Sequence, residues 1–287
     1  WLDQSLAHSV AYDRLDLGWQ HAGRLTALRQ AKSFSNERTS EKNGGAVFRK
    51  LTLFVAAAST AAAVLVGWRM SGDSEITYAT SIGGREVIRM VDGSQIELNT
   101  DSAIRISDRA KRREVWLDRG EAYFQVVHDE RHPFIVNAGD RKITDLGTKF
   151  SIRREGASLK VGVSEGGVRL ETGNESAQPQ AVVLTAGQVA LATPQGISFV
   201  KENGGDLKDE LAWRNGVLIF HRTRLADAAA EFNRYNHRKI TVADPAVANL
   251  EIGGTFPTTD VEGFAEVSRD VLHLRVTKSI EAIRIAR

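Results

Sequence analysis

Apolar and polar residues alternate along the middle of the chain. From Ile76 to about Val200, pairs of apolar residues two positions apart are separated by short segments rich in Gly, Asp and Asn. The pairs are Ile96/Leu98, Ile104/Ile106, Val115/Leu117, Phe124/Val126, Phe134/Val136, Phe150/Ile152, Val161/Val163, Val168/Leu170 and Val189/Leu191. A period of two, with turn signals every roughly 8–12 residues, is typical of all-β domains. We predict such a domain over residues 76–200, built as a sandwich, a barrel or a coiled stack of two sheets.

The pattern changes in the last part of the chain, where strand-like stretches alternate with two helical stripes. Thr223 is placed to cap the first helix, and Thr259-x-x-Glu262 has the form of a capping box that opens the second. The stripes consist of Leu225, Ala229 and Phe232 and of Val261, Phe264, Val267 and Val271. The strand-like stretches are 217–220, 239–242, 250–256, 274–277 and 282–285. This order predicts a small α+β module over residues 210–287, in which a β-α-β unit is repeated.

A helical stripe also lies near the start of the chain. Its face is formed by Ala11, Leu15, Trp19 and Ala22, at steps of four, four and three residues. We predict a helical region over residues 1–32 and a polar linker over residues 33–50. Because a helix this short is marginal in water, the stripe requires a partner or further helices upstream, and we expect sequence to be missing before Trp1.

Between the linker and the β domain lies a stretch of eighteen residues without a charge, Leu51 to Trp68. At ~1.5 Å per residue it spans roughly 27 Å, close to the thickness of a bilayer's hydrocarbon core. The alternative is a buried, Ala-rich core helix. We predict a transmembrane helix over residues 51–68. Five basic residues in 31–50, against two in 69–88, place the N-terminal side in the cytoplasm and the C-terminal side beyond the membrane.

Composition narrows the chemistry. The net charge of +2 is too balanced to indicate a nucleic-acid partner, and without Cys there is no disulfide, thiolate nucleophile or Cys-zinc site. His128 and His132, with Asp129 and Glu130 between them, invite a metal interpretation, but the segment follows a strand and precedes Pro133, so we interpret it as a polar turn. The basic run 109–113 is interpreted as a solvated connector. We predict no cofactor and no metal.

Several short motifs resemble, in order and spacing, the periplasmic domain of FecR-type anti-sigma factors. They are Asp92-Gly-Ser94, Leu98-Asn99, Arg119-Gly-Glu-Ala-Tyr-Phe124, Val127-His-Asp129, Pro133-Phe134, Leu146-Gly-Thr-Lys-Phe150 and Val163-x-Glu165-Gly166. Upstream, Trp1, His8, Tyr12 and Trp19 resemble the end of that family's sigma-binding region. Downstream, Ala212-Trp213-Arg214-Asn-Gly216, Leu218, Phe220, Leu225 and Arg234-Tyr235 resemble its C-terminal module, which is similar to the short N-terminal domain of secretins and TonB-dependent transporters.

The resemblance implies a multidomain protein: a cytoplasmic α-helical segment, one transmembrane helix, an all-β periplasmic domain and a small C-terminal α+β module. It implies a single-pass inner-membrane anti-sigma factor, not an enzyme. Its expected partners are an extracytoplasmic-function sigma factor in the cytoplasm, the signalling domain of a TonB-dependent outer-membrane transporter in the periplasm, and membrane proteases.

The resemblance also singles out one bond, because some FecR-type proteins cleave themselves between Gly and Thr at the position of Gly147-Thr148. There a hydroxyl that attacks the preceding carbonyl would give an ester that water can hydrolyse. The alternative is a tight turn that uses glycine for its backbone freedom. For the whole protein, the leading alternative is a membrane-anchored periplasmic module that binds an envelope glycan; a tethered hydrolase is a third class, but the pattern offers no constellation for it.

Overall fold

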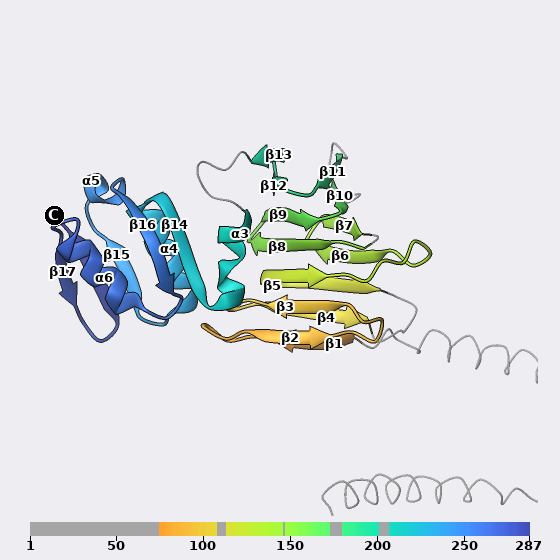
Figure 1. Cartoon of the computed structure of the whole chain (residues 1–287), viewed down its shortest axis with the longest axis horizontal. Helices are drawn as coiled ribbons and strands as arrows, with labels where there is room; N and C mark the ends of the chain where they lie inside the picture. Colours follow the sequence, from red (N-terminus) through yellow and green to blue (C-terminus); the bar gives the residue numbers. More distant parts are fainter. Residues whose placement is uncertain (1–74, 108–112, 146, 173–179, 201–206) are drawn as a thin grey trace, which may run out of the picture. The chain divides into compact units, whose positions relative to one another are not determined.

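The computed structural model describes residues 75–107, 113–145, 147–172, 180–200 and 207–287. The chain divides into two compact units, Trp1–Met70 and Ser71–Arg287, and all described residues belong to the second. Within that unit we call residues 75–200 the β domain and residues 207–287 the C-terminal module (Figure 1).

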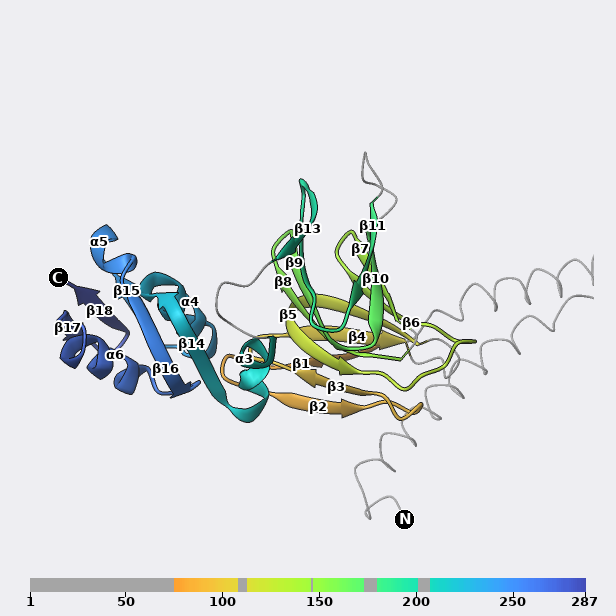
Figure 2. The ribbon, with the colours of Figure 1, turned by 45° about the horizontal axis from the view of Figure 1, so that its top comes forward.

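The β domain is one highly curved sheet of thirteen strands (Figure 2). The strands are β1 (Glu75–Ala79), β2 (Glu86–Arg89), β3 (Gln95–Leu98), β4 (Ala103–Ser107), β5 (Glu114–Gln125), β6 (Phe134–Ala138), β7 (Arg141–Asp145), β8 (Lys149–Glu155), β9 (Ser158–Glu165), β10 (Gly167–Thr172), β11 (Ala181–Thr185), β12 (Val189–Thr193) and β13 (Gly196–Val200). The main path runs β11-β10-β7-β6-β5-β8-β9-β12-β13, and β1 to β4 attach at β4 and β3, which both pair with β5.

The long strand β5 joins the two halves of this sheet. Its first part pairs with β4 and β6, and its second part pairs with β3 and β8. Asp118-Arg-Gly120 is one of the short Gly- and Asp-containing segments that the sequence pattern predicts as turns between strands. The strand instead continues through Gly120 at φ +84°, where a methyl group would lie 2.2 Å from Oγ of Ser102. A single glycine therefore allows β5 to pass from one half of the sheet to the other without ending.

The two halves of the sheet face each other across one apolar core. Alternate residues of each strand point inward, as in β6, where Phe134, Val136 and Ala138 are buried and the residues between them are half-buried. At the centre, the rings of Phe124 and Phe150 are stacked 4.9 Å apart, and Phe134 meets Phe124 edge-on at 6.1 Å. The alternation that predicted strands is thus the alternation that fills the core.

The C-terminal module consists of two small sheets with helices. Its elements are α3 (Leu207–Glu210), the 3₁₀ helix η3 (Leu211–Asn215), β14 (Val217–Arg224), α4 (Leu225–Tyr235), β15 (Lys239–Val242), α5 (Pro245–Ala248), β16 (Glu251–Pro257), α6 (Val261–Asp270), β17 (Arg275–Lys278) and β18 (Ala282–Ala286). β14 pairs with β16, whereas β18 pairs with β15 and β17 in a separate sheet. The rings of Phe220, Phe232, Phe256 and Phe264 form its core, with centroids 4.6–6.5 Å apart.

The helix starts differ slightly from those predicted. α4 begins at Leu225 after Arg224, and no side chain caps it, so Thr223 is not its cap. α6 begins at Val261, and the carboxylate of Asp260 accepts a hydrogen bond from the amide of Gly263 at 2.8 Å. Glu262 is in an ion pair with Lys278 instead of closing a capping box. Aspartate at the next position is the better acceptor for this turn.

The predicted fold class requires a correction. The part of the chain that the structure describes is mostly β sheet, and it holds no helix long and apolar enough to cross a membrane. A fold class that combines a helical segment and a membrane-spanning helix with the β domain is contradicted by these findings. The helical region predicted over 1–32, the linker over 33–50 and the span predicted over 51–68 lie outside the described residues.

Candidate functional site

The turn between β7 and β8 carries the Gly147-Thr148 bond. Gly147 has φ +140°, a conformation that residues with side chains rarely adopt. A methyl group there would lie 2.4 Å from Cα of His128 and 2.7 Å from its Nδ1, so glycine is required for steric reasons as well. The sequence-predicted pair is therefore held in an unusual backbone conformation against a neighbouring loop.

A buried carboxylate holds both amides of this pair. Asp145 is fully buried; its Oδ1 accepts from the amide of Gly147 at 3.0 Å, and its Oδ2 accepts from the amide of Thr148 at 3.2 Å. Thr148 is 6% exposed, and its hydroxyl has no hydrogen-bond partner. An unpaired buried hydroxyl next to the carbonyl of a constrained glycine has the groups that acyl transfer needs.

A second constellation lies where the β domain meets the C-terminal module. The amide of Asn99 donates to Oε2 of Glu121 at 2.9 Å and to the Tyr235 hydroxyl at 2.7 Å. Arg234 donates to the same Glu121 oxygen at 2.6 Å and to Glu231, and Glu231 accepts from Arg153 at 2.8 Å. We call these six residues, Asn99, Glu121, Arg153, Glu231, Arg234 and Tyr235, the interdomain network.

Burial and charge shift the titration of these groups. Burial, together with the nearby Glu121 carboxylate, raises the pKa of Tyr235. Burial by itself would raise the pKa of Glu231, but Arg234 and Arg153 outweigh it, so the pKa lies below its ordinary value. Burial would lower the pKa of Arg234, and Glu121 and Glu231 raise it instead. Glu231 and Arg234 therefore stay charged at neutral pH, and each charged side chain of the interdomain network has a partner of opposite charge.

Two arginines extend the same interface. Arg85 donates to the carbonyls of Trp213 and Arg214, at 2.7 and 2.6 Å. Arg214 in turn donates to Glu97 at 2.9 Å, and its guanidinium lies 3.8 Å from the ring centroid of Tyr123. A planar guanidinium makes such stacked and bidentate contacts together, which a lysine cannot. The residues 212–216 that resembled the C-terminal module thus dock it on the β domain.

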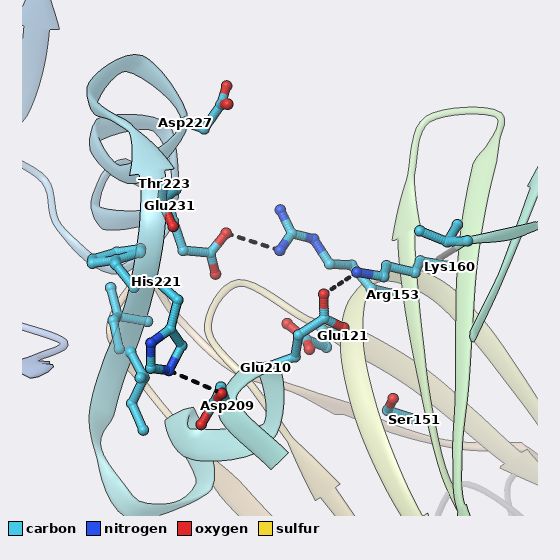
Figure 3. A pocket seen from close by; sticks show the side chains of 14 residues that line it. Glu121, Ser151, Arg153, Lys160, Asp209, Glu210, His221, Thr223, Asp227 and Glu231 are labelled. Atoms are coloured by element: carbon cyan, nitrogen blue, oxygen red, sulfur yellow. Dashed lines mark hydrogen bonds and ion pairs between the residues drawn. The ribbon is translucent and has the colours of Figure 1, made fainter. Parts of the chain in front are cut away.

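Beside the interdomain network lies a groove of about 490 Å³ (Figure 3). We call it the edge groove. Its lining residues are Glu121, Ser151, Arg153, Lys160, Val200, Asp209, Glu210, Leu218, Ile219, Phe220, His221, Thr223, Asp227 and Glu231. Figure 3 shows Arg153 reaching Glu231 across the groove, and His221 beside Asp209. The distance between Nε2 of His221 and Oδ2 of Asp209 is 3.1 Å. Both the β domain and the C-terminal module therefore contribute walls.

The other predicted site residues divide into two groups. Trp1, His8, Tyr12 and Trp19 lie outside the described residues. His132 pairs with Asp129 at 2.9 Å, and His128 lies 3.7 Å from Glu130, all of them substantially exposed. Across the described ranges no group of three or more His, Asp or Glu side chains could hold a metal ion. The polar turn predicted there is present.

Sequence reasoning did not find Asp145 or the partners of the interdomain network. Asp145 stands directly before Leu146-Gly-Thr, and a carboxylate three residues before a Thr is a usable signal for a side chain that caps a turn. Asn99 and Tyr235 both occur in the quoted motifs, but they are 136 residues apart, and no local pattern indicates that they touch.

Comparison with known proteins identifies the β domain. Residues 76–169 match the family described as FecR protein. Two solved structures of a candidate anti-sigma factor from Parabacteroides distasonis ATCC 8503, at 2.50 and 1.65 Å, have the same fold. Each superimposes with a TM-score of 0.60; they are 23% and 22% identical to this chain, cover 75% and 73% of it, and are themselves covered to 99% and 98%. No curated protein matches the chain.

These findings define the class of the matched segment: residues 76–169 of the β domain are similar to the FecR protein family, and a small α+β module is docked on this domain. The resemblance to FecR-type proteins that the motifs predicted is thus supported over residues 76–169, and the two solved structures share the fold of the described chain.

Proposed function

We propose that this protein sequesters an extracytoplasmic-function sigma factor and releases it on a periplasmic signal. In this proposal the β domain and the C-terminal module lie in the periplasm, where the signalling domain of a TonB-dependent outer-membrane transporter contacts them. Membrane proteases then free the sigma factor. Trp1, His8, Tyr12 and Trp19 are the residues proposed to contribute to sigma binding.

The observation that carries the proposal is the interdomain network. A receiver module has to be coupled to the rest of the protein, and here the buried carboxylate of Glu121, the half-buried carboxylate of Glu231 and two arginines link it to the β domain. Since a buried ion pair is costly to break one partner at a time, the module and the domain move together. A partner that binds the module therefore acts on the β domain as well.

Capture experiments test this function. The purified chain is immobilised and offered, in separate experiments, the signalling domains of the producing organism's TonB-dependent transporters and its extracytoplasmic-function sigma factors. We expect one signalling domain and one sigma factor to be retained. Retention of neither would contradict the proposal, and retention of a soluble envelope glycan in their place would support the glycan-binding alternative.

The glycan alternative receives no support from the edge groove. Sugar-binding grooves present exposed aromatic rings, on which the apolar faces of sugars stack. The aromatic residue that lines this groove is Phe220, and it is 6% exposed. Within the described residues, the groove is lined mainly by charged side chains and by one strand.

Self-cleavage between Gly147 and Thr148 is a second proposed activity, favoured by the unpaired, buried Thr148 hydroxyl. The hydroxyl oxygen adds to the Gly147 carbonyl, the peptide C–N bond breaks, and the Thr148 nitrogen takes the proton, which leaves an ester. Water then hydrolyses the ester to a Gly147 carboxylate and a new N-terminal Thr148. On a denaturing gel, freshly expressed wild type should give two fragments and Thr148→Ala one full-length band; identical single bands would contradict the proposal.

A further inference from the structure

Strand β14 has one unpaired edge. It pairs with β16 along its other edge, and in the part of the chain that the structure describes no strand pairs on the open side. The edge groove contacts Leu218, Ile219 and Phe220, three consecutive residues. Because consecutive side chains of a strand point to opposite faces, a groove that contacts all three has to run along the backbone edge. The open edge of β14 therefore forms one wall of the groove.

This edge lacks the usual protection against another strand. Residues 217–220 read Val-Leu-Ile-Phe, without a charge or a proline, whereas natural edge strands are commonly guarded by both. Features that prevent strand pairing begin only after Phe220. There the pairing with β16 shifts between Phe220 and Thr223, and the charged residue Arg222 has φ +49°. About four residues of regular, apolar edge remain open to an incoming strand.

The rest of the groove supplies charge. It is lined by five carboxylates, those of Glu121, Asp209, Glu210, Asp227 and Glu231, but by only two permanent cations, Arg153 and Lys160. Most of these side chains are in ion pairs, some of them with Arg224 and Arg234 beside the lining, so the groove is not a bare acidic cluster. With these two arginines counted and His221 neutral, one carboxylate remains in excess and the net charge is −1. Such a wall favours a partner with basic side chains and disfavours an acidic one.

We propose that the edge groove binds an extended, basic segment of the partner protein, which is added as a strand to the open edge of β14. The main chain of the segment pairs with residues 217–220, and its alternate basic side chains face the carboxylates of the groove. This inference rests on the proposed function, in which the segment belongs to the transporter's signalling domain. The bound strand contacts both walls, and so contacts the β domain and the C-terminal module at once.

Two synthetic peptides test the proposal on the full chain. The probes are capped heptapeptides that alternate valine with lysine or valine with glutamate, labelled for fluorescence anisotropy. We expect the lysine peptide to bind at least tenfold more tightly than the glutamate peptide, and its affinity to fall as salt is raised. Equal affinities, or no binding of the lysine peptide at millimolar concentration, would overturn the proposal.

Matched charge reversals locate the site. Asp227 lines the groove and Asp270 does not; both side chains are 62% exposed, and each is in an ion pair with an arginine nearby in the sequence, Arg224 and Arg269. We expect Asp227→Lys to weaken the lysine peptide at least threefold and Asp270→Lys to leave its affinity within a factor of 1.5. Because both positions are on the surface, folding is preserved in each variant. An equal effect of the two would contradict binding in the groove.

Backbone methylation tests the mode of binding. In a lysine peptide methylated on alternate amides, one edge of the strand can no longer pair, whereas the opposite edge is unchanged. Of the two possible methylation registers, we expect one to lose binding at least tenfold and the other to keep it. If both registers bind equally, the peptide is not added as a strand and the proposal fails.

The same variants separate this inference from the proposed function. If a transporter signalling domain is captured equally by wild type and Asp227→Lys, the function stands and the groove is not its site. If no signalling domain is captured but the lysine peptide binds, strand addition in the edge groove is supported and the proposed transporter partner is contradicted. A second copy of this chain is the other possible occupant: self-association in sedimentation velocity that the lysine peptide abolishes would overturn the assignment to a foreign segment.

Discussion

Gly147 has no side chain, and the space beside it is already filled by His128. An added methyl group would overlap the backbone Cα of His128 as well as its side chain, so rotation of that side chain alone cannot relieve the overlap. The sequence indicated that a glycine with a special conformation was needed there. It did not indicate why, because the loop that carries His128 lies on the far side of β6 and β7 in the sequence. Steric demands between distant segments are invisible to local patterns.

Gly147→Ala should lower the free energy of unfolding by about 2–4 kcal/mol, because the conformation is unfavourable for alanine and its methyl group would overlap Cα of His128. Gly156→Ala is the matched control: Gly156 has φ +57° but no atom within 4 Å of the added methyl, so the loss should be about 1 kcal/mol. Urea unfolding of both variants measures the difference. Equal losses would mean that the overlap with His128 is relieved at no cost.

Glu231 predicts a pH dependence. Its pKa is below the ordinary value in the folded state, so its contribution to stability is present above the unfolded pKa of about 4.3 and is lost as pH falls through the folded pKa. Glu231→Gln should therefore be less stable than wild type by about 1–3 kcal/mol at pH 7, and the gap should begin to narrow as pH falls below the unfolded pKa of about 4.3. Urea midpoints from pH 3 to 7 measure this. A gap of the same size at pH 3 and pH 7 would show that it does not depend on the charge.

Strands and helices were predictable to the degree that their buried positions are apolar. β7 was missed because two of its three buried positions are Arg141 and Asp145, so the alternation is present but carried by charged residues. Lys239–Val242, by contrast, was predicted with its observed bounds. The turn predicted at 118–120 was wrong, because Gly120 changes the direction of β5 and does not end the strand. Alternation of apolar and polar residues predicts burial from polarity alone. The prediction therefore fails where a buried position carries a polar side chain whose hydrogen bonds are satisfied.

The start of α6 gives a test of capping. Asp260→Ala should cost about 1 kcal/mol, because the amide of Gly263 loses its acceptor at the positive end of the helix dipole. Thr259→Ala, at the position where the sequence placed the cap, should change stability by less than about 0.5 kcal/mol. Thermal unfolding of the two variants compares them. A larger loss for Thr259→Ala would restore the capping box that the sequence predicted.

At the level of the complete protein, the order of strands could not be read from the sequence. The path places β7 beside β10 and β5 beside both β6 and β8, and these pairings depend on complementarity between surfaces that are remote in the chain. The docking of the C-terminal module on the β domain could not be predicted either, although three residues that make the contacts, Asn99, Arg214 and Arg234, lie in the motifs quoted from the sequence. Their presence was predictable, whereas their contacts were not.

The interdomain network predicts cooperative unfolding. Wild type should show one calorimetric transition for the β domain and the C-terminal module together. Arg234→Ala leaves the carboxylate of Glu121, which is 8% exposed, without its cation, and should cost about 3–5 kcal/mol and split the transition into two. Arg269→Ala, an exposed control, should shift it by less than about 0.5 kcal/mol. A single, merely lowered transition for Arg234→Ala would show that other contacts couple the two parts.

The position of the Gly147-Thr148 bond within the sheet has a mechanical consequence. Strands on its C-terminal side are hydrogen-bonded to strands on its N-terminal side, β8 to β5 and β10 to β7, and their side chains share one core. Hydrolysis there would leave two polypeptides assembled as a noncovalent heterodimer. Pulling the halves apart, not breaking the peptide bond, would then be the slow and force-sensitive event.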